Sequence, residues 1–162
     1  MGKTEQLQIR VTVKEKATLR RMARSAGQDL SSYVLVRALP EQRLRFQELV
    51  ATVADDDERR FALAELNDLL VNLTRAELSD ALADAPVLAL SPYWKNYVAA
   101  MVEQAAHQKK VPAPPWLSNI EPLTEPHFAA PLENLRLYLL RVSPVPFRRR
   151  NIFIDSSVGG RV

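Results

Sequence analysis

The chain has 162 residues, of which 47% are apolar and 25% are charged, which is the composition of a globular protein with one or two small domains. It has no cysteine, which excludes disulfides, thiolate chemistry and cysteine-based zinc sites. The sequence has neither the run of about 18 apolar residues typical of a membrane-spanning helix nor the apolar core of a signal peptide at its polar N-terminus. We therefore expect a cytoplasmic protein with no membrane partner.

The net charge of +3 conceals an uneven distribution along the sequence. Residues 1–39 carry 8 Lys and Arg against 3 Asp and Glu, whereas residues 40–110 carry 8 against 12. Residues 111–162 carry 6 against 4. A basic N-terminal segment favours a polyanionic partner such as nucleic acid at that end, and a solvated basic face is the plainer alternative.

The first predicted element is a β-strand over residues 6–13, because apolar and polar residues alternate in QLQIRVTV. A helix is expected to follow, since Thr12 and Glu15 form a capping-box pattern and Gly27 is a natural helix stop. A second helix is expected over DLSSYVLVRAL. Its candidate N-caps are Asp29, Ser31 and Ser32.

Residues 41–110 predict a helical bundle. Thr74 and Glu77 form a second capping box, and Ser91 followed by Pro92 is a typical helix start. The acidic run at 55–58 is explained by a helix N-terminus, where negative charge is favourable. The apolar positions at helical spacing, which we expect in the core, are Leu44, Phe46, Leu49, Val50, Val53, Phe61, Leu66, Leu69, Leu70, Leu73, Trp94, Val98, Met101, Val102 and Ala105.

The composition changes at residue 111, since eight of the 11 prolines lie between Pro112 and Pro146. Proline disfavours regular helix and central strand, yet this segment has too many large apolar residues for a solvated linker. A short apolar helix is expected in LENLRLYLLRVSP, followed by a basic run and a strand-like NIFID. We predict that residues 111–162 form an extended arm that docks on a partner, on the dimer mate or on its own helical body.

The N-terminal module is too small to bury its apolar strand face alone. Two copies that pair their strands antiparallel would form a two-stranded ribbon, which fits the major groove of B-DNA. With LQIRVT, EKATLRRMARSAG and DLSSYVLVRAL in this order, residues 5–40 resemble the ribbon-helix-helix family of DNA-binding proteins. The resemblance implies a mainly α fold that begins with a homodimeric ribbon-helix-helix module at 1–40.

Matched by position, the resemblance implies that Gln6, Gln8 and Arg10 read bases. Arginine can bond guanine bidentately and glutamine can do the same to adenine. In this family the second helix aims its N-terminal amides at a phosphate, so the serines at that end are candidates, with plain N-capping as the alternative. The candidate phosphate ligands are Lys3, Thr12, Lys14, Ser31 and Ser32, with Lys16 and Arg20 as further backbone contacts.

Antitoxins of this family repress their own promoter through the ribbon and block a toxin through the C-terminal part. PFRRRNIFID also resembles the ends of antitoxins encoded beside nucleotidyltransferase-type toxins. Aromatic rings are good anchors, and arginines can neutralise an acidic pocket. The predicted toxin-binding residues are Trp116, Phe128, Phe147, Arg148, Arg149, Arg150 and Phe153.

No catalytic set is discernible, so the sequence predicts a chain that is not an enzyme and that binds no metal or cofactor. His107 and His127 lack a second ligand at metal-binding spacing, and four glycines form no phosphate loop. The leading hypothesis is an antitoxin-type autoregulator with operator DNA and a cognate toxin as partners. The alternatives are a stand-alone ribbon-helix-helix repressor, a plasmid mobilisation accessory protein and a structural helical oligomer.

Overall fold

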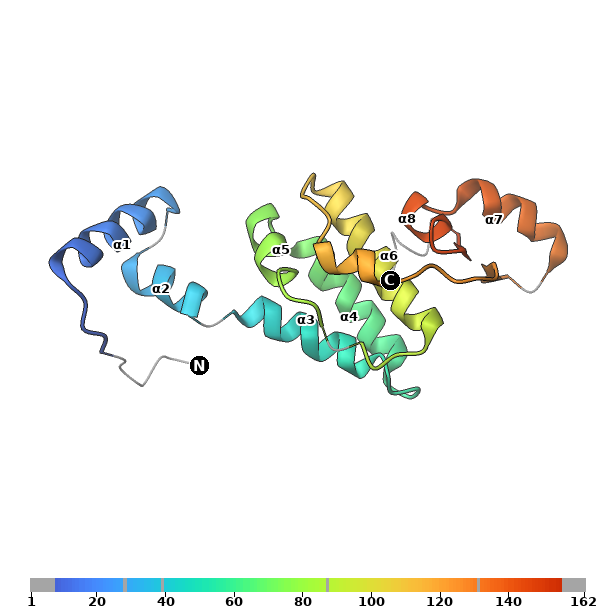
Figure 1. Cartoon of the computed structure of the whole chain (residues 1–162), viewed down its shortest axis with the longest axis horizontal. Helices are drawn as coiled ribbons and strands as arrows, with labels where there is room; N and C mark the ends of the chain where they lie inside the picture. The colour runs from blue at the N-terminus through green and yellow to red at the C-terminus, as the bar shows by residue number, and fades with distance from the viewer. Residues whose placement is uncertain (1–7, 28, 39, 87, 131, 156–162) are drawn as a thin grey trace. The chain divides into compact units, whose positions relative to one another are not determined.

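A computed structural model describes residues 8–27, 29–38, 40–86, 88–130 and 132–155, which are mainly helical, as predicted (Figure 1). The chain divides into two compact units, residues 1–41 and 42–162. Within the described part, no helix combines the length and hydropathy needed to cross a bilayer. The helices are α1 (Val13–Ser25), α2 (Leu30–Ala38), α3 (Glu41–Thr52), α4 (Arg59–Asn72), α5 (Arg75–Ala81), α6 (Pro92–Gln108), α7 (Arg136–Val142) and α8 (Val145–Arg148). The short elements are η1 (Pro115–Asn119), β1 (His127–Phe128), η2 (Glu133–Leu135) and β2 (Ile152–Phe153).

The first unit contains α1 and α2 but no strand among its described residues. Residues 8–12 lead into α1 without regular structure, and Val13, which the alternation assigned to the strand, is the first residue of α1. A strand needs a neighbour for its backbone groups, and the described residues of this single chain provide none at this end. Gly27, with φ of +65°, follows the end of α1 as predicted.

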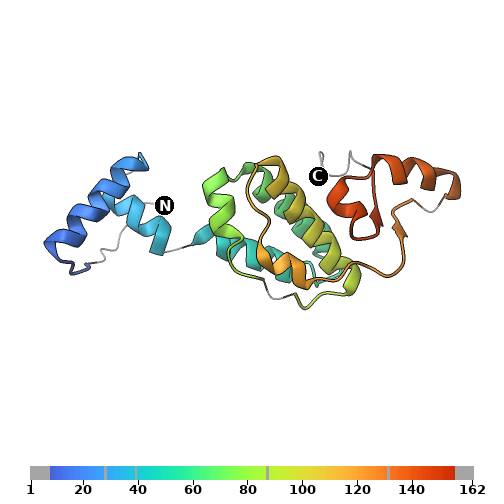
Figure 2. The same cartoon turned by 45° about the horizontal axis from the view of Figure 1, so that its top comes forward.

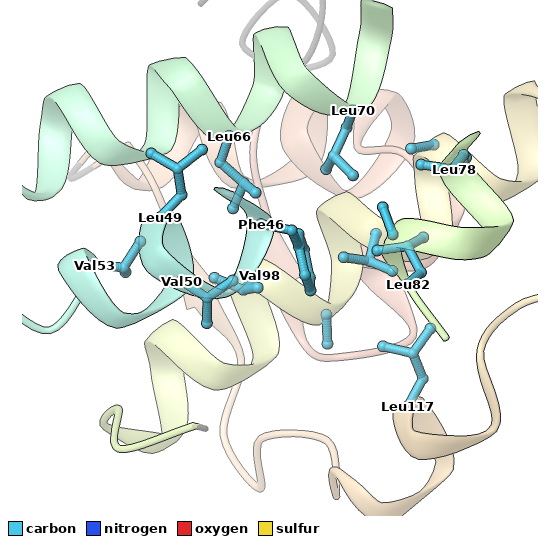
Figure 3. Packing of buried hydrophobic residues seen from close by; sticks show 14 of the residues in the cluster. Phe46, Leu49, Val50, Val53, Leu66, Leu70, Leu78, Leu82, Val98 and Leu117 are labelled. Atoms are coloured by element: carbon cyan, nitrogen blue, oxygen red, sulfur yellow. The ribbon is translucent and has the colours of Figure 1, made fainter. Parts of the chain in front are cut away.

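The second unit is organised around one hydrophobic core between α3, α4, α5, α6 and η1 (Figure 3). Phe46, Leu66 and Val98 are fully buried there, in agreement with the helical spacing. The spacing was wrong for Leu44 and Phe61, which are 52% and 69% exposed. Both lie on amphipathic surface helices, where periodicity alone does not fix how wide the buried face is.

The described part of the Pro-rich segment packs on the helices of its own chain, which is one of the three dockings that the sequence left open. Trp116 on η1 packs against Phe46, with ring centroids 6.5 Å apart, and its Nε1 donates to the carbonyl of Leu82 at 3.0 Å. Proline-rich chain can be buried in this way because aromatic packing and side-chain hydrogen bonds replace a backbone ladder.

The last described residues form a smaller cluster on the other side of α6. Both views show α6 between the group α3–α5 and the segment α7–α8 (Figures 1 and 2). Strand β2 pairs in parallel with β1, and the His127 N–H donates to the Asn151 carbonyl at 2.8 Å. The buried members of this cluster are Ala100, Phe147, Ile152 and Ile154.

Candidate nucleic-acid and partner interfaces

The N-terminal unit leaves much of its apolar surface exposed. Ile9 and Val11, in the segment before α1, are 58% and 43% exposed, and Met22 on α1 is 44% exposed. Among the described apolar side chains of this unit, only Ala23 and Tyr33 are buried. So small a core offsets little of the conformational entropy lost on folding. These exposed side chains are therefore candidates for contact with a further surface.

Two of the three predicted base-reading residues lie in the described chain. Gln8 and Arg10 are both exposed, in a segment without regular structure where they alternate with apolar residues. Residues two apart share a face when such a segment pairs as a strand, as contact with base edges requires. Gln6 and Lys3 lie outside the described residues.

Helix α1 begins with the predicted capping box and carries a basic surface. The Thr12 N–H donates to the Glu15 carboxylate at 2.8 Å, and the Glu15 N–H donates to Thr12 Oγ1 at 3.3 Å. The bonds from the backbone and then the hydroxyl of Thr12 lower the pKa of Glu15. The Thr12 hydroxyl is thus engaged at the helix start, which weakens its case as a phosphate ligand. The exposed basic residues of α1 are Lys14, Lys16, Arg20, Arg21 and Arg24.

Helix α2 is capped by Asp29, one of its three candidate caps. The Ser32 N–H donates to Asp29 Oδ1 at 3.0 Å, and both Ser31 and Ser32 lie in the first turn. Ser31 is exposed and Ser32 is half-buried. Because a carboxylate at this helix end repels a phosphate, the two serines are weaker phosphate ligands than the sequence predicted.

The predicted aromatic anchors of the C-terminal segment are used mainly inside the chain. Trp116, Phe147 and Phe153 are buried, so a partner cannot reach them in this fold. Phe128 is half-buried and stacks on Phe153 with ring centroids 4.8 Å apart. These rings stabilise the second unit.

The three consecutive arginines occupy different environments. Arg148 and Arg149 are exposed, whereas Arg150 is only 6% exposed. Arg150 Nη1 donates to Asn96 Oδ1 at 3.2 Å, and its Nη2 lies 3.7 Å from the Glu103 carboxylate. Burial lowers the pKa of Arg150, and the Glu103 carboxylate opposes that shift. Arg150 therefore fastens the C-terminal segment to α6, and only its two neighbours are accessible to a partner.

The sequence predicted a short apolar helix at α7, with Tyr138 as one aromatic anchor, but it did not single out the exposed leucines of this helix. Leu139 is buried, while Leu137, Tyr138 and Leu140 are exposed. The signal lies in RLYLLRV itself, which has apolar residues on every side of a seven-residue helix. A helix that packs on one side cannot bury all of them.

A cavity of about 480 Å³ opens between α6 and α8. Its wall includes His107 and the pair formed by Arg149 and Glu103, whose side chains lie 3.2 Å apart. The charges of that pair offset one another, and the rest of the wall is largely apolar. Across the described residues, no three His, Asp or Glu side chains gather in a way that could hold a metal ion.

Comparison of the chain with protein-family models, with curated proteins and with solved structures gives no match. Evidence on function therefore comes from the two surfaces described above. One is the basic, incompletely buried unit at the N-terminus. The other is formed by the exposed apolar residues of α7, with the exposed Arg148 and Arg149 following in the sequence.

Proposed function

We propose that this chain is an antitoxin-type transcriptional autoregulator. It binds operator DNA as a homodimer through an N-terminal β-ribbon of the ribbon-helix-helix type, and it neutralises a cognate toxin through its second unit. Such a regulator acts in the cytoplasm and is not an enzyme. The observation that carries the proposal is the small core formed by the described residues of the first unit, together with the alternating, exposed residues 8–12.

A second copy of the segment 8–12 supplies what the single chain lacks. Antiparallel pairing satisfies the backbone groups of both copies and covers Ile9 and Val11, while Gln8 and Arg10 face outward together. Full burial of an exposed aliphatic side chain contributes roughly 1.5–3 kcal/mol. Ile9 and Val11 are 58% and 43% exposed, so each would contribute part of that amount. The basic surface of α1 adds long-range attraction for the phosphate backbone.

The toxin-binding half of the proposal is supported by the second unit. Its α7 face exposes apolar side chains, and Arg148 and Arg149 are exposed beside it in sequence. Arginines bind carboxylates and phosphates through charge-assisted hydrogen bonds, which suits a toxin with an acidic or phosphate-binding pocket, such as a nucleotidyltransferase. Phe128 is the one half-buried ring among the predicted anchors.

The DNA-binding half is tested by titrating the full chain into a fluorescently labelled duplex of the DNA upstream of its own gene. Fluorescence anisotropy measures the affinity. Arg10→Ala should weaken specific binding by about 1–3 kcal/mol, which is roughly 5–150-fold. Arg60→Ala, an exposed arginine of the second unit, is the matched control and should leave the affinity unchanged. Binding of both variants with the native affinity would refute the ribbon assignment. A complete lack of salt-dependent DNA binding would favour a structural oligomer.

The toxin-binding half is tested by expressing the adjacent gene alone and together with this chain. Toxicity that this chain relieves supports the proposal, whereas an adjacent relaxase gene would favour a mobilisation accessory protein. Deletion of residues 111–162 is a poor variant for this test, because Trp116 and Phe147 are part of the core. Point substitutions of exposed residues keep the fold intact.

A further inference from the structure

The strongest unassigned surface of the second unit is α7 together with its flanking residues. Leu137 is 78% exposed, Tyr138 is 49% exposed and Leu140 is 41% exposed. On a helix, residues three and four apart are neighbours, so Leu137 and Leu140 lie side by side. The same spacing puts Arg141 beside Leu137, and Arg136 beside Leu140. The exposed face is therefore an aliphatic pair with an arginine next to each leucine.

This face carries positive charge that is only partly balanced. The stretch from Arg136 to Arg150 contains five arginines and neither aspartate nor glutamate. Arg136 lies 3.7 Å from the Glu133 carboxylate, but the side chain of Glu133 is 85% exposed, so this pair is weak. Within the described residues, Arg141 and Arg148 form no ion pair. An incoming acidic group would thus meet Arg141 without an ion pair among the described residues and Arg136 with only a weak one.

The helix is held firmly from its buried side. Ser143 Oγ lies 2.6 Å from the Leu139 carbonyl and 2.7 Å from the Ile154 carbonyl. Tyr138 donates its hydroxyl to the Asp155 carboxylate at 3.0 Å, and this bond raises the pKa of Tyr138. These contacts tie α7 to the residues around β2. A surface fixed before binding loses less entropy when a partner docks.

Three occupants can be compared by their chemistry. A second copy of this face would bring its arginines against those of the first, which is repulsive. DNA would complement the charge of the arginines, but it would place the apolar side chains of Leu137 and Leu140 against charged phosphates. A protein groove with an apolar floor and a rim of Asp and Glu matches both components.

We propose that the α7 face, formed by Arg136, Leu137, Leu140 and Arg141, docks into an apolar groove with an acidic rim on the toxin that this chain neutralises. The inference rests on the toxin-binding half of the proposed function. It adds the contact surface on this chain and the chemistry of the complementary surface. The aliphatic pair provides the buried centre of the contact, and the arginines provide charge complementarity at its rim.

The test uses the full chain and the purified product of the adjacent gene, with binding measured by calorimetry. Leu137→Asp and Arg141→Glu should each weaken binding at least tenfold, and salt should weaken the native complex more than that of Arg141→Glu. Phe61→Asp is the matched control, because Phe61 is also an exposed apolar residue of the second unit, and it should bind as the native chain does. Circular dichroism should show the same melting temperature for all variants.

The outcomes separate the two levels of the proposal. If the native chain binds and Leu137→Asp and Arg141→Glu bind equally well, the α7 assignment is overturned while toxin binding stands. If the native chain does not bind the adjacent product, the toxin-binding half fails and the α7 assignment fails with it. If Leu137→Asp instead dissolves an oligomer of this chain or weakens DNA binding, the occupant is a second copy or DNA, and the inference is wrong.

Discussion

The two units of this chain differ in how far each completes its own core. In residues 42–162 a continuous cluster runs through α3, α4, α5, α6 and η1 and includes fully buried Phe46 and Leu66. In residues 1–41 the described apolar side chains bury only Ala23 and Tyr33, while Ile9 and Val11 stay exposed. Among the described residues, the second unit has a continuous buried core of its own, whereas the first leaves Ile9, Val11 and Met22 exposed. The proposed ribbon would cover part of that exposed surface.

The largest effect is expected in the complete core. Phe46→Ala removes a fully buried ring that packs against Trp116 and should lower the free energy of unfolding by about 3–5 kcal/mol. Both tryptophans, Trp94 and Trp116, belong to the second unit, so tryptophan fluorescence during urea unfolding reports on that unit. Phe61→Ala, on an exposed ring of α4, should change the same transition little. Equal losses for the two variants would contradict the core assignment.

The incomplete unit should respond differently, through association rather than through its own unfolding. Ile9→Asp puts a charge into the proposed strand pair twice per dimer and should weaken dimerisation by about 3 kcal/mol, which is over 100-fold. Sedimentation velocity measures the shift to monomer. Val71→Asp, at a 53% exposed aliphatic position of α4, should leave the dimer intact. If Val71→Asp dissociates the dimer and Ile9→Asp does not, the dimer contact lies on the second unit and the ribbon assignment is wrong.

A middle-sized effect is expected where the C-terminal segment joins the core. Arg150→Met removes the arginine donors to Asn96 Oδ1 and to the Ile120 and Leu117 carbonyls, of which the Leu117 carbonyl keeps the Ile120 N–H. It should cost about 2 kcal/mol in the tryptophan-detected transition. Arg149→Met removes an exposed arginine that bonds the same Glu103 and should cost less than about 1 kcal/mol. If Arg149→Met lowers the free energy of unfolding as much as Arg150→Met does, the buried contacts of Arg150 are not what attaches the C-terminal segment to α6.

Local features were predictable from the sequence because short-range chemistry determines them. The capping boxes of Thr12 and Thr74 and the Ser91 cap are confirmed, since each depends on residues within three positions. Asp29 was one of three candidate caps, and the sequence alone did not select it. The predicted strand before α1 is not formed in the described residues 8–12, and the proposed function places its pairing partner in a second copy of the chain.

The long-range contacts were not predictable in the same way. Arg150 bonds Asn96 across 54 positions, and Trp116 bonds the Leu82 carbonyl across 34. No spacing rule links residues so far apart, and the prolines between 112 and 146 remove the periodicity that signals burial. Arginines 148, 149 and 150 look alike in the sequence, and only the fold buries the last of them. Which candidate toxin-binding residues are accessible therefore followed from tertiary packing.

The smallest effect is expected at the helix N-termini, where each unit has one capping box, Thr12 with Glu15 and Thr74 with Glu77. Thr74→Ala should cost about 1 kcal/mol in the tryptophan-detected transition, because the Glu77 N–H loses its acceptor. The bonds from the Thr74 hydroxyl and then its N–H also lower the pKa of Glu77. A carboxyl group with a lowered pKa in the folded state stabilises the fold above its unfolded pKa and loses that contribution as pH falls through its folded pKa.

The destabilisation caused by Glu77→Ala should therefore be complete at neutral pH and shrink as pH falls below about 4.3, the unperturbed value for glutamate. Urea unfolding at a series of pH values measures this difference directly. A difference that persists undiminished in acid would mean that the carboxylate bonds are not its source. Glu15→Ala removes the equivalent group in the first unit, where there is no tryptophan, and should leave the tryptophan-detected transition unchanged at every pH. A change there would show that the stability of the second unit depends on the first, and the comparison between an independent and a dependent unit would then fail.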